Sequence, residues 1–168
     1  MQNIHIRELD GLRVEKIRTK LERAARGGDK DVLFEISSRG GDHDAVFELI
    51  EFLSKNEFRT SCFVTRSASA AALLAISCAG RKIRKKGKMF LHAVELTIPV
   101  TLVLETGVVP QGTLEKCRAR QQQTEELLRE KTKLANGELT RIMAPGSTGT
   151  FNSQEALHWG LVDEVLDY

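Results

Sequence analysis

Three short motifs contain residue types that together could carry out acyl transfer. They are the glycine pair Gly40-Gly41, a serine among alanines at Ser69, and a histidine, His92, that follows the apolar residues 89–91. A serine hydroxyl becomes a nucleophile when a neighbouring imidazole takes its proton. Backbone N–H groups at a glycine turn or a helix start can stabilise the oxyanion that the attack creates. The motifs therefore occur in the order oxyanion donor, nucleophile, base.

Each motif alone also has an ordinary structural interpretation. Paired glycines often only make a tight turn. A serine at a helix start commonly caps the helix, and a histidine at the end of an apolar strand is more often a hydrogen-bonded core residue. The combination favours chemistry, because each of the three motifs follows a predicted strand.

Hydrophobic periodicity predicts the elements that position these motifs. Alternating apolar residues predict strands near residues 4–6, 32–36, 60–65 and 89–91. Helical spacing predicts helices near 14–24 and 46–53, the second with Asp42 or Asp44 as its N-cap, and a buried helix that starts within 67–75. This β-α alternation predicts an α/β fold with largely parallel strands. The carboxyl ends of parallel strands share one sheet edge, so we expect the motifs to converge there.

Three further segments do not follow the regular pattern. Residues 96–110 are strongly apolar and predict a strand or hairpin that is buried, pairs with substrate or takes part in assembly. Residues 113–134 predict a long polar helix, which usually projects from a core or packs on a partner. The basic run 81–88 lacks aromatic residues, so we interpret it as a solvated loop rather than a nucleic-acid site. We also place His43 on the surface by default.

Composition places the chain among ordinary globular proteins. It has 168 residues, of which 41% are hydrophobic and 29% charged, and a net charge of +2. These values predict a single domain over residues 1–168 and give no reason to expect nucleic-acid binding. Cys62, Cys78 and Cys117 have no metal-ligand spacing and indicate reduced thiols. No apolar run reaches the length of a membrane span, so we expect a cytoplasmic protein that does not enter membranes.

The motifs resemble those of the ClpP family, the proteolytic subunits of Clp protease. Residues 36–41 are similar to the family's Asn-Ser-Pro-Gly-Gly turn, and residues 64–72 align without a gap with the stretch around its nucleophile. Residues 89–92 resemble the strand that ends in the family's catalytic histidine. Residues 151–163 resemble its C-terminal signature. The resemblance extends from about residue 31 to residue 165.

The resemblance implies both a fold and a set of roles. The fold is a ClpP/crotonase-like α/β fold of repeated β-β-α and β-α units, with a protruding handle helix in a handle region of about residues 95–135. Ser69 would be the nucleophile and His92 the general base, while the N–H groups of Gly41 and Ala70 would line the oxyanion hole. Ser67 is a rival nucleophile. The resemblance implies peptide or protein substrates, assembly of identical subunits through the handle region, and no metal or organic cofactor.

The chain departs from the family where the third member of the triad would lie. The family has an aspartate just before its Phe-x-Ser segment, but residues 144–151 contain no carboxylate, and the best-aligned position is Gly149. A backbone carbonyl, Ser147, Thr148, Glu95 or a residue from a neighbouring subunit could replace it. Arg39 stands where the family has proline, and Ala71 where it has glycine.

These departures leave alternatives to a serine peptidase. One is a catalytically inactive Clp-like structural subunit, which the missing aspartate favours. Another is a crotonase-type enzyme that acts on an acyl-thioester. Because the sequence starts almost at its first predicted strand, we do not expect the family's axial loops or coupling to a Clp ATPase.

Overall fold

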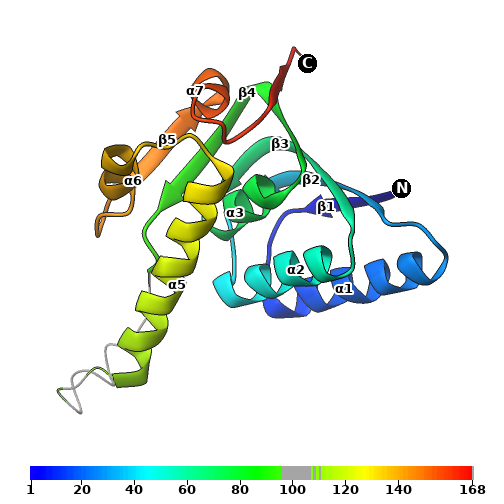
Figure 1. The fold of residues 1–168 in the computed structure, drawn as a ribbon, viewed down its shortest axis with the longest axis horizontal. Helices are drawn as coiled ribbons and strands as arrows, with labels where there is room; N and C mark the ends of the chain where they lie inside the picture. The colour runs from blue at the N-terminus through cyan, green and yellow to red at the C-terminus, as the bar shows by residue number, and fades with distance from the viewer. Residues whose placement is uncertain (96–106, 108, 110, 168) are drawn as a thin grey trace.

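The computed structural model describes residues 1–95, 107, 109 and 111–167 (Figure 1). The strands are β1 (Gln2–Ile6), β2 (Asp31–Ser38), β3 (Arg59–Ala68), β4 (Gly80–His92), β5 (Thr148–Asn152) and β6 (Glu164–Leu166). The helices are α1 (Gly11–Arg26), α2 (His43–Lys55), α3 (Ala70–Ser77), α5 (Gln111–Lys131), α6 (Asn136–Ile142) and α7 (Ser153–His158). The strand or hairpin predicted over 96–110 falls, apart from residues 107 and 109, outside the described residues.

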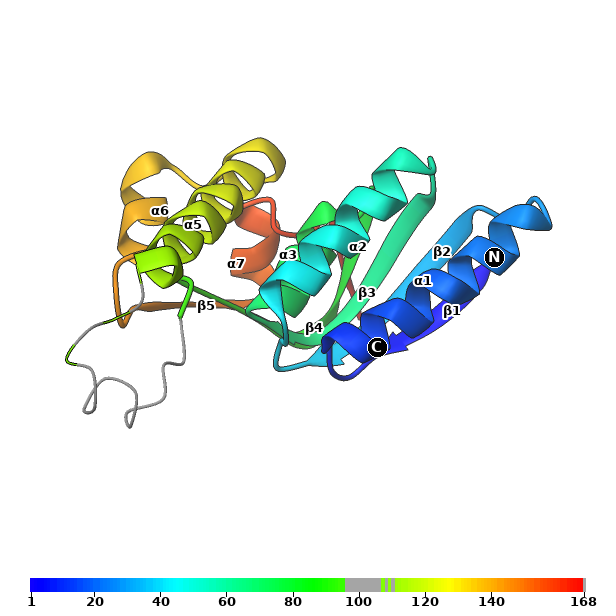
Figure 2. The same ribbon diagram turned by 90° about the horizontal axis from the view of Figure 1, so that it is seen from below.

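The strands form one sheet in the order β1-β2-β3-β4-β5, and β6 pairs with β4. Strands β1 to β4 are parallel neighbours in chain order, whereas β5 is antiparallel to β4. Figure 2 shows α1, α2 and α3 together on one face of the sheet. The predicted α/β fold with parallel strands is therefore confirmed. The carboxyl ends of β1 to β4 lie at one edge, as the prediction requires.

Helix α3 forms the centre of the core under this edge. All residues from Ala70 to Ile76 are buried, and they pack against sheet residues such as Phe34 and Val64. An all-apolar helix is stable only inside a protein, which explains why its sequence has no polar face. Burial on all sides fixes the position of the helix start next to β3.

Side-chain caps define where two of the predicted helices begin. Asp10 accepts a hydrogen bond from the N–H of Arg13 at 2.7 Å and so caps α1. Asp42 accepts from the N–H of Ala45 at 3.1 Å and caps α2. Of the two candidates for the second cap, Asp42 is thus the N-cap, and Asp44 lies in the first turn of the helix.

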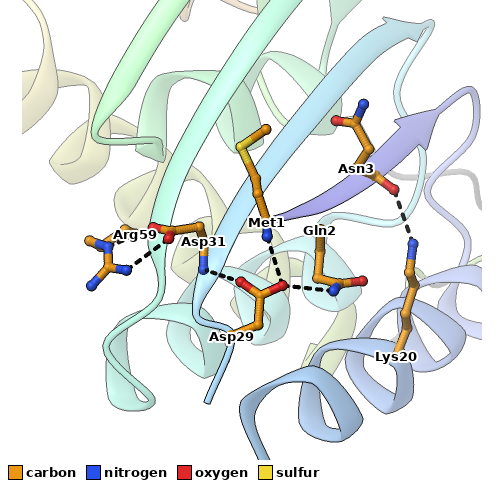
Figure 3. A network of polar contacts seen from close by, with 7 residues as sticks. All are labelled: Met1, Gln2, Asn3, Lys20, Asp29, Asp31 and Arg59. Atoms are coloured by element: carbon orange, nitrogen blue, oxygen red, sulfur yellow. Dashed lines mark hydrogen bonds and ion pairs between the residues drawn. The ribbon is translucent and has the colours of Figure 1, made fainter. Parts of the chain in front are cut away.

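The amino ends of the first three strands are tied together by a polar network (Figure 3). The Asp29 carboxylate accepts hydrogen bonds from the Met1 ammonium at 2.8 Å and the Gln2 amide at 2.9 Å. These donors lower the pKa of Asp29 to about 2. The N–H of Asp31 donates to Asp29, and the Asp31 carboxylate in turn pairs with Arg59. The network lies at the edge of the sheet opposite the carboxyl ends.

The basic run 81–88 is not a loop, because it lies within β4. Its charged residues are mostly exposed, while Ile83, Gly87 and Met89 are buried. Acidic residues in and beside β6 neutralise several of the charges, with ion pairs of 2.6 Å (Arg81–Asp163), 2.7 Å (Lys82–Glu164) and 2.9 Å (Lys85–Asp167). The sequence interpretation was wrong because these partners lie about eighty residues away and are not visible in the local pattern.

The predicted polar helix exists as α5, and α6 follows it without having been predicted. Helix α5 packs against α3 near its carboxyl end, and its first half extends away from the sheet (Figure 1). Within the described ranges, no helix has the length and apolar character needed to cross a membrane.

Candidate active site

Ser69 occupies the tight turn that joins β3 to α3. Its backbone has φ 53° and ψ −131°, a conformation that residues with a side chain rarely adopt. Hydrogen bonds hold the turn on both sides, because the Ser69 N–H donates to the Phe90 carbonyl at 3.0 Å and the Ser69 carbonyl accepts from Ala72 at 2.9 Å. The hydroxyl makes no capping hydrogen bond. Ser69 is therefore at the N-cap position, but its side chain does not serve as a cap.

The rival serine lies in a different environment. Ser67 is part of β3, and 0% of its surface is exposed. Its Oγ is buried and has no hydrogen-bond partner among the described residues. Ser69 instead lines a cavity. The geometry favours Ser69 over Ser67 as the residue that a substrate can reach.

The two glycines of the neighbouring loop are required by close backbone packing. A Cβ on Gly40, which has φ 119°, would lie 2.8 Å from the Cβ of Ser69. A Cβ on Gly41 would lie 2.3 Å from the carbonyl oxygen of Leu9. The loop is held there by hydrogen bonds from Leu9 to the Gly40 carbonyl at 3.3 Å and from Asp42 to the Leu9 carbonyl at 2.7 Å.

The two hydrogen bonds between Leu9 and this loop also orient the N–H of Gly41. The Gly40 carbonyl and the Asp42 N–H both point toward Leu9, and successive backbone groups in an extended chain point to opposite sides. The Gly41 N–H therefore points away from Leu9. Gly41 lines the same cavity as Ser69, so this N–H is a candidate oxyanion donor.

His92 is the last residue of β4, and its ring is oriented by the backbone. Its Nδ1 lies 2.6 Å from the carbonyl oxygen of Ala93. A carbonyl can only accept, so Nδ1 carries a proton, and in the neutral imidazole this leaves Nε2 as the acceptor. Nδ1 also lies 4.0 Å from a carboxylate oxygen of Glu95, whose side chain is 73% exposed. The ring thus has the tautomer that a general base needs.

One cavity of about 360 Å³ brings the predicted residues together. Ser69, His92, Gly41 and Ala70 all line it, and Leu73 and Leu91 give it an apolar wall. The four residues come from three separate strand ends and the start of α3. A hydroxyl, an imidazole acceptor and backbone N–H groups around one space are the components of acyl transfer.

The third triad member is absent from the position where the resemblance places it. Gly149 lies in β5 and pairs with Leu91, next to the pair of Thr148 with His92. A Cβ on Gly149 would lie 2.8 Å from Cγ1 of Ile142, which belongs to α6. An aspartate there would collide with Ile142 unless that side chain moved. The Ala93 carbonyl is the acceptor that Nδ1 has instead.

Three polar residues of the cavity were missed by the sequence analysis. They are His43, Arg120 and Thr124. The expectation that His43 lies on the surface was wrong, because its side chain is only 13% exposed. Its Nε2 lies 2.9 Å from Thr124 Oγ1 on α5, and its ring stacks on Phe47. No local signal reveals this position, since the covering helix α5 is about eighty residues away in sequence.

An ion pair next to His43 joins α2 to α5 across the cavity. The Arg120 guanidinium donates to both carboxylate oxygens of Asp44, with Nε to Oδ1 at 2.7 Å. Arg120 holds the pKa of Asp44 below its usual range. Burial lowers the pKa of His43, and Asp44 only partly opposes this effect. The described residues contain no group of three or more His, Cys, Asp or Glu side chains placed to hold a metal ion.

Comparison with known proteins identifies the family. The model of the Clp protease family matches residues 13–168, that is, all but the first twelve residues. The matched range spans the Gly40-Gly41 turn, Ser69 and His92. A search of curated proteins found no match. The family match over nearly the whole sequence, together with the α/β fold, shows that the chain belongs to the Clp protease family.

Proposed function

We propose that this protein is a serine peptidase of the Clp type, with Ser69 as nucleophile and His92 as general base. The family match supports peptidase chemistry in general. The observation that carries the assignment of residues is the Ser69 turn. Ser69 has a positive φ and a hydroxyl that makes no capping hydrogen bond, and it lines the same cavity as His92. Strained turns of this kind are kept where they position a reacting group.

The proposed cycle rests on the cavity that Ser69 and His92 share and on the hydrogen bond of His92 Nδ1 to the Ala93 carbonyl. Nε2 of His92 takes the proton of the Ser69 hydroxyl as Oγ attacks the acyl carbon of a peptide. The oxyanion is stabilised by the N–H groups of Gly41 and Ala70, with the amino end of α3 adding its positive dipole. The imidazolium then protonates the leaving amine. Water next attacks the acyl-enzyme, again with His92 as base.

The Ala93 carbonyl takes the place of the triad carboxylate in this proposal. It fixes the tautomer of His92, but as a neutral acceptor it stabilises the imidazolium less than a carboxylate would. In the serine-protease template, replacing the triad aspartate by its amide lowers kcat about 10⁴-fold. We therefore expect slow turnover, with the acylation of Ser69 easier to detect than peptide hydrolysis.

Assembly and substrate follow from the family as further proposals. We infer that identical subunits associate through the handle region, since half of α5 extends beyond the sheet and the helices that cover it. The substrates are peptides or proteins. The three cysteines are free thiols, which supports the cytoplasm as the expected compartment.

One observation favours a second function, that of a catalytically inactive structural subunit. Ile142 fills the space in which an aspartate at position 149 would lie. The carboxylate is therefore missing, and the space for it is also occupied by the Ile142 side chain. A structural subunit would keep the fold and the assembly surfaces, but Ser69 would have no reactivity beyond that of an ordinary serine.

Labelling with a fluorophosphonate distinguishes the two functions. We expect the folded protein to be labelled at Ser69, as located by mass spectrometry, and we expect labelling to disappear in Ser69→Ala and His92→Ala. Ser67→Ala is the matched control and should leave labelling within about threefold, because Ser67 is buried. Absence of labelling in the folded, assembled protein would reject the peptidase proposal and leave the structural subunit.

A further inference from the structure

A second cavity lies beside the candidate active site and is lined by three arginines. Arg7, Arg39 and Arg66 surround a space of about 740 Å³. Gly40 and Gly41 form its wall on the side of the active site, and Gly41 lines both cavities. Gly40 in turn touches Ser69, since a Cβ on Gly40 would lie 2.8 Å from the Ser69 Cβ. The arginines are thus separated from the serine by one loop.

The position of the arginines follows from the topology of the sheet. Arg7 and Arg39 directly follow the last residues of β1 and β2, and Arg66 lies near the end of β3. These three strands are parallel neighbours, so their carboxyl ends share one edge. Each of the three strand ends thus carries a guanidinium, and Arg39 directly precedes the Gly40-Gly41 turn.

The charges of these arginines are not neutralised within the described part of the chain. None of the three has a carboxylate oxygen within 4.0 Å there. Glu8 also lines the cavity, but it pairs with Arg13 at 3.1 Å. The Arg66 guanidinium lies 5.1 Å above the Phe90 ring, a cation–π contact that positions the side chain and leaves its charge in place.

Like charges that share a cavity repel one another, and an anion from outside would remove this repulsion. Guanidinium groups bind carboxylates through paired hydrogen bonds, which single out a carboxylate from a neutral amide. The cavity contains no aromatic residue among its lining side chains, so it has no platform for stacking nucleobases. Because Gly41 lines both cavities, the arginine cavity adjoins the space in which a peptide would bind at Ser69.

We propose that this cavity binds a carboxylate of the peptide substrate and makes the enzyme selective for acidic peptides. The inference rests on the proposed function, because it takes Ser69 as the point of attack. The carboxylate is either an Asp or Glu side chain near the bond that is cleaved or the carboxyl terminus of the peptide. Arg39 would be the residue nearest to the oxyanion loop, since it directly precedes Gly40.

Binding to the Ser69→Ala variant tests the inference without requiring turnover. Fluorescent peptides that differ only in Glu or Gln at one position, each with a free or an amidated carboxyl terminus, are titrated and followed by anisotropy. The three arginines are exposed, and exposed ion pairs contribute about 0.2–1 kcal/mol each, so we expect the Glu peptide, or the peptide with the free terminus, to bind about tenfold more tightly. The preference should decrease between low and high salt.

Arginine variants show which residues cause the preference. Arg7→Gln, Arg39→Gln and Arg66→Gln, made in the Ser69→Ala background, should each reduce the preference about two- to threefold. Arg26→Gln is the matched control, because Arg26 is exposed at the far end of α1, about 24 Å of helix away from the start of α1. It should leave the preference unchanged.

The outcomes separate this inference from the proposed function. Equal binding of Glu and Gln peptides and of free and amidated termini would overturn the inference, even if fluorophosphonate labels Ser69. The same holds for a preference that survives all three arginine variants. Tighter binding of a single-stranded oligonucleotide than of any acidic peptide would also overturn it. A clear carboxylate preference with no labelling of Ser69 would instead contradict only the peptidase proposal.

Discussion

Close packing between Gly40 and Ser69 links the Gly40-Gly41 turn directly to the proposed nucleophile. At Gly40 a side chain would meet the Cβ of Ser69 at 2.8 Å and the Ala68 carbonyl at 2.9 Å, in a backbone conformation with φ 119°. We expect Gly40→Ala to displace the Ser69 turn and to lower the rate of fluorophosphonate labelling at least tenfold, because small misplacements of a reacting group are costly. The strained backbone should also reduce the free energy of unfolding by about 1–3 kcal/mol, measured by urea denaturation.

Gly28→Ala is the matched control for this prediction. Gly28 also has a positive φ, of 81°, but a Cβ added to it would have no atom within 4 Å. We expect this variant to lose about 1–2 kcal/mol of stability while the labelling rate of Ser69 stays unchanged. Similar labelling rates for Gly40→Ala and Gly28→Ala would show that the loop does not position Ser69.

At the scale of single residues, the sequence predicted which residues form the candidate site, but not the backbone conformation or the hydrogen-bond partners of those residues. The order of the Gly-Gly, Ser69 and His92 motifs predicted that they meet, because parallel strands have their carboxyl ends at one edge. The left-handed turn at Ser69 was not predictable, since it depends on how α3 is buried. A backbone carbonyl was one of several alternatives for the third group, but the sequence did not single out Ala93, because this hydrogen bond depends on how the chain turns after β4.

The contact between helices α2 and α5, made by His43 with Thr124 and by Asp44 with Arg120, should make the stability of the protein depend on pH. His43 is held between Phe47 and Thr124, with Asp42, Asp44 and Arg120 as the charged groups around it. Burial puts the pKa of His43 in the folded protein below its usual value of about 6.5. The unfolded chain therefore binds more protons as the pH falls through this range, and the folded protein loses stability.

We expect the free energy of unfolding to decrease from pH 7 to pH 5, with part of the decrease caused by His43. The variant His43→Gln keeps a neutral hydrogen-bonding side chain near Thr124. Its free energy of unfolding should therefore decrease less between pH 7 and pH 5 than that of the original protein. The measurement is urea denaturation of both proteins at several pH values between 5 and 8. His158→Gln is the control, since His158 is exposed on α7 and should leave the pH dependence as in the original protein. An identical pH dependence in His43→Gln would contradict the prediction.

Elements show why local sequence patterns succeed or fail. Strands β2 and β3 alternate cleanly and were predicted, because their neighbours on both sides complete a buried sheet. The basic part of β4 was taken for a loop, since its charges are neutralised by residues beside β6 rather than by neighbours in the sequence. Helix α6 was not predicted, although its residue Ile142 decides what fits next to His92.

At the scale of the whole molecule, α5 is covered by its own chain over only part of its length (Figure 1). Its second half packs on α3, its middle carries Arg120 and Thr124 into the site, and it starts beyond the sheet and the helices on it (Figures 1 and 2). Leu114 lies near the start of α5 and is 49% exposed, among residues that are mostly charged or polar. A single exposed leucine is ordinary on a protein surface, so we choose Leu114 as a test position because it lies on the part of α5 that its own chain leaves uncovered.

We expect the protein to sediment as an assembly of several copies and Leu114→Glu to shift it toward the single chain. Burying a leucine contributes about 1.5–3 kcal/mol, so the substitution should weaken association at least tenfold at each contact. Sedimentation velocity over a range of protein concentrations measures this change. Leu157→Glu is the matched control, because Leu157 is an exposed leucine on α7, at the opposite end of the molecule from the start of α5. A similar loss of assembly in both variants would show that the effect is not specific to α5. Unchanged assembly in Leu114→Glu would exclude this part of the handle region as the subunit contact.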